Sequence, residues 1–148
     1  MKSFNGFTPT SISFLKELAA NNSKEWFEER RGVYQEHILE PLKQLTEELG
    51  ATIATIDPHI DITPAINRTI SKIYRDVRFS NDKSPLRTDL WISFRRPNKV
   101  WGNVPEFYFY FTPEEYQYGM GFYSATSESM ERIRGRIIAD QARFKAII

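Results

Sequence analysis

The sequence predicts an α+β domain in which N-terminal helices and a C-terminal helix pack on a short, mainly antiparallel sheet. Two observations predict this class. Apolar residues recur at helical spacing before residue 57, and β-branched and aromatic runs dominate residues 90–123. Helices followed by strands and then by another helix are typical of α+β proteins, whereas alternating βαβ units are not.

The first helix is predicted to begin at Thr8-Pro9. The Thr8 side chain can accept a hydrogen bond from a free amide of the first turn, and Pro9 suits a position that needs no N–H. A second helix is predicted after a break at residues 21–23. We expect Asn22 to cap its first turn, with Glu25 three residues later completing the reciprocal capping pair.

The second helix carries one apolar stripe that extends from Phe27 to Leu49. Pro41 lies inside this stripe and removes one backbone donor. We therefore expect a kink, or a break into two helices, near Glu40. Gly50 is a candidate end of the helix, although the apolar spacing continues beyond it.

The predicted sheet has a strand over residues 90–94 and a nearly continuous aromatic strand over residues 107–111. A Thr-Pro-Glu-Glu turn separates the second strand from a third one over residues 116–123. The short turn predicts an antiparallel hairpin. A last helix is predicted to begin within residues 127–129 and to continue to the final residue.

Length and composition predict one globular domain over residues 1–148. The chain is 41% hydrophobic and 26% charged, as in ordinary globular proteins, and it has no cysteine, which excludes disulfides and thiolate metal sites. No run approaches the length of a membrane span, so we expect a cytoplasmic protein without a membrane partner. The sequence does not reveal the oligomeric state.

Charge is distributed unevenly along the chain. The net charge is only +1, but residues 68–99 hold nine Lys or Arg against three Asp or Glu. This excess predicts either an anionic partner that meets the middle of the chain or a solvated basic face. The anionic partner would be a small molecule or a nucleotide, and nucleic acid is the weaker alternative because the net charge is low.

The most informative segment is residues 72–89. Residues 80–85 are rich in Ser, Asn, Asp and Pro, which favour turns, and a turn here should bring several cations near one loop. Guanidinium groups match phosphate and carboxylate oxygens in pairs, so the segment predicts an oxyanion site. The alternative is an ion-pair network in which the aspartates of the segment neutralise its arginines. The candidate ligand-binding residues are Tyr74, Arg75, Arg78, Lys83, Ser84, Arg87 and Trp91.

This segment resembles a known family. The run from Tyr74 to Ser80, then Asp82-Lys83-Ser84-Pro85 after one residue, is similar to the signature of the conserved hypothetical bacterial and fungal proteins named domain of unknown function 2461. Further matching stretches are residues 4–7, 14–15, 18–22, 25–27, 119–121 and 132–134. The resemblance implies no activity. It implies a C-terminal part beyond residue 148, so we expect the chain to be truncated there.

Other site chemistry has little support in the sequence. His37 and His59 show no metal-ligand spacing, Ser84 lacks the context of a nucleophile, and the lone Gly119-x-Gly121 does not make a dinucleotide fingerprint. No metal or cofactor is therefore expected. Three functions stay open: a binding module for an anionic ligand, a structural protein with an ion-pair lock, and an enzyme that acts on an anionic substrate.

Overall fold

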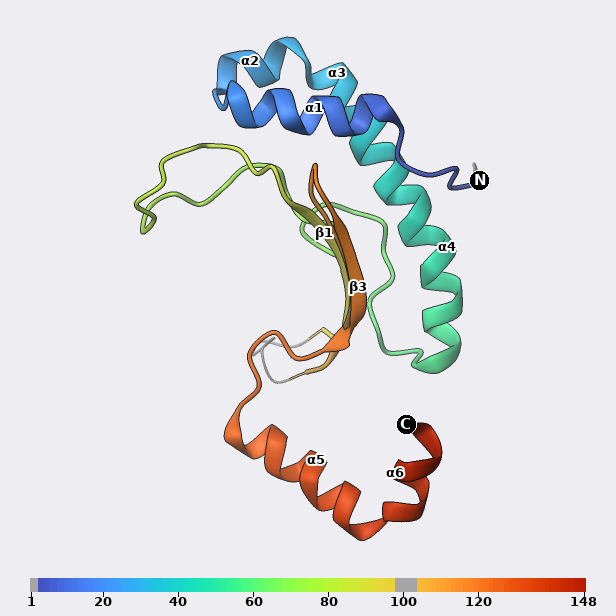
Figure 1. Cartoon of the computed structure of the whole chain (residues 1–148). Coiled ribbons are helices and arrows are strands. Elements are labelled where there is room, and N and C mark those ends of the chain that lie inside the picture. The colour runs from blue at the N-terminus through green and yellow to red at the C-terminus, as the bar shows by residue number, and fades with distance from the viewer. Residues whose placement is uncertain (1–2, 98–103) are drawn as a thin grey trace.

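The computed structural model describes residues 3–97 and 104–148 and has the predicted α+β architecture (Figure 1). The N-terminal half is helical, with α1 (Pro9–Ala20), α2 (Lys24–Glu29), α3 (Arg31–Tyr34), the π-helical turn η1 (Gln35–Leu39) and α4 (Glu40–Ile56). The remainder contains β1 (Leu90–Phe94), β2 (Glu106–Phe111), β3 (Tyr116–Gly121), α5 (Ser127–Ala139) and α6 (Gln141–Ile147).

The strands form one antiparallel sheet in the order β1-β2-β3, so the aromatic strand β2 is central. Leu90 pairs with Phe111 at one end of the first ladder, and Glu106 pairs with Gly121 at one end of the second. The Thr112 hydroxyl accepts hydrogen bonds from the amides of Glu114 and Glu115 and so closes the hairpin turn. The predicted hairpin is confirmed, and its second strand ends at Gly121.

The two faces of the sheet differ because side chains alternate along each strand. One face carries Leu90, Ile92, Phe94 and Phe111, all buried in the core with residues of the N-terminal helices. In Figure 1, α4 lies along one side of the sheet and no helix lies along the other. We call this other side the open face. Its strand residues are Trp91, Ser93, Glu106, Tyr108, Tyr110, Gln117, Gly119 and Gly121.

The start of α1 agrees with the sequence prediction, whereas the start of α2 does not. Thr8 and Ser11 form a reciprocal capping pair, with Pro9 in the first turn. The cap of α2 is Ser23, whose hydroxyl accepts from the Trp26 amide at 3.2 Å. The predicted role of Asn22 as this cap is wrong, because its side chain is used for a contact distant in sequence.

The helix changes its form near Glu40, as predicted, because the π-helical turn ends at Leu39 and α4 begins at Glu40. Pro41 lies in the first turn of α4 and cannot donate to the carbonyl of His37, which instead accepts from the Ser11 hydroxyl at 2.6 Å. The helix also continues through Gly50 to Ile56. Gly50 instead allows a close approach, because a Cβ atom there would lie 3.1 Å from Cβ of Ile62.

The C-terminal helical region is interrupted at Asp140 and is therefore two helices, not the single predicted one. Thr126 caps α5, and the Asp140 carboxylate accepts from the Arg143 amide at the start of α6. Neither helix contains a buried residue. Within the described ranges, no helix is both long and apolar enough to cross a membrane.

Tyr34 contributes an unusual polar group to the core. Its ring packs against Phe14 and Phe27, and the side chain is only 4% exposed. Among the described residues its hydroxyl has no hydrogen-bond partner. Burial is the main reason why the pKa of Tyr34 is raised to about 12.

Tyr34→Phe should therefore leave the free energy of unfolding unchanged at pH 7 or raise it by about 1 kcal/mol, since it removes an unsatisfied buried hydroxyl. The raised pKa means that the fold favours the neutral phenol. This contribution is complete below pH 10 and is lost as pH rises toward 12, at about 1.4 kcal/mol per pKa unit.

Urea unfolding between pH 8 and pH 11 measures both effects. The alkaline loss should be smaller in Tyr34→Phe than in wild type. Tyr118→Phe is the control, because Tyr118 is 76% exposed. A loss of more than 1 kcal/mol at pH 7 in Tyr34→Phe would show that the hydroxyl has a partner.

Candidate functional site

The arginine segment, defined here as residues 75–87, leaves and rejoins the body of the protein at one place. Tyr74 forms an isolated antiparallel bridge with Leu86. The amide of Arg75 donates to the carbonyl of Pro85 at 2.9 Å, and the amide of Arg87 donates to the carbonyl of Ile73 at 2.7 Å. The residues between these contacts form a long loop that projects beyond the sheet (Figure 1).

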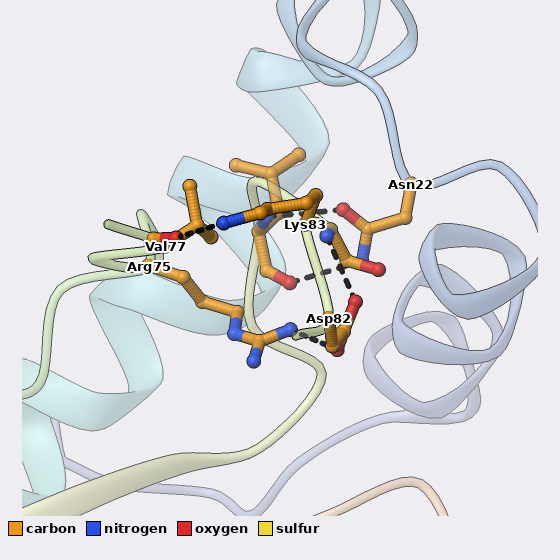
Figure 2. A network of polar contacts seen from close by, with 7 residues as sticks. Asn22, Arg75, Val77, Asp82 and Lys83 are labelled. Carbon is orange, nitrogen blue, oxygen red and sulfur yellow. Dashed lines mark hydrogen bonds and ion pairs between the residues drawn. The ribbon is translucent and has the colours of Figure 1, made fainter. Parts of the chain in front are cut away.

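Asn22 fixes the base of this loop to the helical layer (Figure 2). Its Nδ2 donates to the carbonyl of Leu86 at 2.9 Å, and its Oδ1 accepts from the amide of Leu86 at 3.0 Å. The side chain thus satisfies both backbone groups of a residue that is only 1% exposed. Because buried backbone groups need partners, this pair of bonds determines where the segment ends and β1 approaches.

Within the loop the aspartates hold the cations, as the ion-pair alternative predicts. Arg75 pairs with Asp82, and the Arg78 guanidinium makes two bonds to Asp76, at 2.6 Å and 2.9 Å. Figure 2 shows the pair of Arg75 with Asp82 beside Lys83, whose ammonium donates to the carbonyl of Val77 at 3.0 Å.

These contacts keep the two carboxylates ionised. Hydrogen bonds from Ser84, and then from Arg75, hold the pKa of Asp82 well below its usual range. Bonds from the side chain and backbone of Arg78 do the same for the pKa of Asp76. Neither carboxyl group can therefore carry a proton for transfer near neutral pH, which counts against their use as general acids.

The structure divides the predicted ligand-binding residues into separate groups. Arg75, Arg78, Lys83 and Ser84 lie in the projecting loop. Tyr74 faces the helical layer, where its hydroxyl bonds Glu28 at 3.0 Å and Arg31 at 3.3 Å. The remaining pair, Arg87 and Trp91, lies at the open face of the sheet, where both residues line a hollow.

The hollow on the open face has a volume of about 860 Å³. Small-molecule sites usually occupy about 300–1,000 Å³. Its principal lining residues are Arg87, Trp91, Arg95, Tyr108, Tyr110 and Tyr123. Asp89 and Glu106 also line it, so the hollow combines two arginines and two carboxylates with a surface rich in aromatic rings.

Arg87 is the notable member of this group. Its guanidinium carbon lies 4.8 Å from the centre of the Trp91 ring, so the indole holds the side chain against the sheet. Within residues 3–97 and 104–148, Arg87 forms no ion pair, and its buried Nε has no hydrogen-bond partner. No carboxylate of the described residues therefore forms an ion pair with the Arg87 guanidinium, which suits it to contact an oxyanion.

Several residues of the open face were not among the site residues predicted from the sequence. Glu106 accepts from Ser93 and lies 3.5 Å from Arg95. The pKa of Tyr110 is raised above its ordinary value, first by burial and then by the charge of Asp89. Polar and aromatic residues alternate along the strands, which indicates two different faces. Which residues share a face can be assigned only once the pairing register is known.

Gly119 lies directly beside the Tyr108 ring on the open face. A Cβ atom at this position would lie 3.2 Å from the hydroxyl oxygen of Tyr108. Glycine thus permits the close approach of the Tyr108 ring, and the ladder continues past Gly119 without a bulge. The part of the chain that the structure describes holds no group of three or more His, Asp or Glu side chains arranged for a metal ion.

Comparison with protein families gives one match. The model of the family described as "Conserved hypothetical protein (DUF2461)" matches residues 10–148. The chain belongs to the DUF2461 family. No curated protein and no solved structure matches the chain. The DUF2461 assignment confirms the resemblance carried by the arginine segment, but its description attaches no activity, so the chemistry of the site must come from the geometry.

Asn22→Ala tests the tether at the base of the arginine segment in this DUF2461 protein. It leaves the amide and the carbonyl of Leu86 buried without partners, so the free energy of unfolding should fall by about 2–4 kcal/mol. Hydrogen exchange in residues 74–88 should accelerate more than exchange in β2. Asn21→Ala is the control, because the Asn21 side chain donates to the carbonyl of Glu17, four residues earlier, on an exposed helix end. Equal losses in the two variants would contradict the tether.

Proposed function

We propose that this protein binds an anionic small molecule on the open face of its sheet, with Arg87 as the main contact. The observation that carries the proposal is that Arg87 lies over Trp91, lines the hollow and forms no ion pair within the described residues. Arginine in an ordinary ion pair would already have an anionic partner. A phosphate or carboxylate beside the Arg87 guanidinium would supply that partner.

The stacking of Arg87 on Trp91 supports the same proposal. A guanidinium held over an indole ring loses less rotational freedom on binding than a free side chain does, so more of the contact energy appears as affinity. The guanidinium also has a planar fork of donors, which favours paired bonds to oxyanions. Arg95 borders the same hollow, but Glu106 lies 3.5 Å from it, so Arg87 is the principal cation there.

For the loop arginines the contacts favour a different role. Arg75 and Arg78 already have carboxylate partners in Asp82 and Asp76. We propose that these pairs act as an ion-pair lock that shapes the loop, with binding of the ligand at Arg87 and Trp91. The direct participation of Arg75, Arg78, Lys83 and Ser84 in binding stays a prediction, and the variants below test it for Arg78.

A thermal-shift screen at low salt would identify the ligand class, using nucleotides, sugar phosphates, dicarboxylates and short single-stranded RNA. A compound at one hundred times its Kd adds roughly 2.7 kcal/mol to stability. Each compound that raises the melting temperature would then be titrated by calorimetry against wild type and two matched variants, Arg87→Gln and Arg78→Gln.

Arg87→Gln should weaken binding about 10- to 100-fold, the value of one charge-assisted hydrogen-bonding group. Arg78→Gln removes the same charge from a side chain that is 76% exposed and paired, so it should change affinity less than threefold. The opposite result would place binding on the loop, and equal affinities in all three proteins would remove arginine recognition altogether.

A further inference from the structure

Two hollows adjoin on the open face and differ in chemistry. A second one, of about 240 Å³, shares Arg87, Trp91, Ser93 and Arg95 with the hollow described above. It adds Arg68 and Lys72 to the basic residues, and no carboxylate lines it. The shared row of side chains is therefore the boundary between a small basic hollow and a large aromatic one.

The larger hollow is suited to a polar ring. Trp91, Tyr108 and Tyr110 line it with aromatic side chains, and Asp89, Glu106 and Gln117 add polar groups to its wall. A saturated acyl chain would desolvate these polar groups without giving them partners, which is costly. A sugar and a heterocycle would instead supply hydroxyl and amine groups to meet them, while the heterocycle stacks on an aromatic side chain.

The charged residues that line the two hollows also favour one orientation of such a ligand. Asp89 and Glu106 line only the larger hollow, where they would repel an anion. The smaller hollow has four cationic side chains: Arg68 pairs with Asp61 at 2.6 Å, Arg95 lies 3.5 Å from Glu106, and Arg87 and Lys72 have no ion pair among the described residues. An anionic group is accordingly favoured on the basic side of the row and a neutral polar group on the other side.

We infer that the ligand of this site is a nucleoside phosphate, with its phosphate in the basic hollow beside Arg87 and Lys72 and its nucleoside in the aromatic hollow over Tyr108. This inference rests on the proposed function and makes it more specific, because inorganic phosphate would fill only the smaller hollow. Both ends of the ligand contribute to affinity, so neither half alone binds as tightly as the whole.

Calorimetric titrations with the whole chain test this arrangement. The probes are a purine and a pyrimidine 5′-monophosphate, the corresponding nucleosides, ribose 5-phosphate and inorganic phosphate. At least one monophosphate should bind tenfold or more tightly than its nucleoside and than inorganic phosphate. Binding of inorganic phosphate or a dicarboxylate that depends on Arg87, with no gain for any nucleotide, would overturn the inference and leave the proposed function standing.

Two variants test which hollow holds the nucleoside and which holds the phosphate. Tyr108→Leu should weaken nucleotides about 5- to 100-fold, the effect of one stacked base, and leave inorganic phosphate unchanged. Lys72→Gln should weaken nucleotides about two- to fivefold and leave nucleosides unchanged. Lys16→Gln is the control for charge, because Lys16 is exposed on α1, outside both hollows. Thermal unfolding checks that each variant is folded.

The remaining outcomes distinguish a failure of the nucleoside-phosphate inference from a failure of the proposed function. Equal losses for nucleoside and nucleotide in Lys72→Gln would contradict the phosphate position. Binding of short single-stranded RNA without binding of any mononucleotide would overturn the nucleoside phosphate and retain the anion site. Nucleotide binding that is unchanged in Arg87→Gln would reject the inference and the proposed function together.

Discussion

The two hydrogen bonds between the Asn22 side chain and the backbone of Leu86 are the constraint on which the site depends. They join residues that are 64 positions apart, one between α1 and α2 and one shortly before β1. Leu86 also bridges Tyr74, so the same residue closes both ends of the arginine segment. Arg87 follows directly, and its position over Trp91 therefore depends on an asparagine in the turn between the first two helices.

The cations of the central segment serve two physical purposes. Arg75 and Arg78 meet carboxylates within the loop, where their charges are neutralised close to their origin. Arg87 lies instead against an aromatic ring and beside other cations of the open face. A local excess of positive charge in a sequence thus divides into a part that shapes the backbone and a part that creates a field at one surface.

Contacts between residues close in sequence could be predicted, whereas contacts between residues distant in sequence could not. Thr8 caps α1 because its partner lies three residues away, and the hairpin turn at Thr112 is equally local. Asn22 fitted a local capping pattern, yet its long-range bonds to Leu86 prevailed and Ser23 took the cap. The open face depends on register between strands, which apolar and aromatic runs alone do not determine. Composition therefore indicated a basic site without indicating its location.

The π-helical turn over Gln35–Leu39 has a consequence for comparing homologous chains. Such a turn holds more residues than an α-helical turn, because its hydrogen bonds span five residues instead of four. A homologue shorter by one residue in this stretch can close it to an ordinary turn and keep the orientation of both flanking helices. A gap in an alignment of α3 and α4 is expected at this turn, where a change of length can be absorbed without displacing the buried side chains on either side.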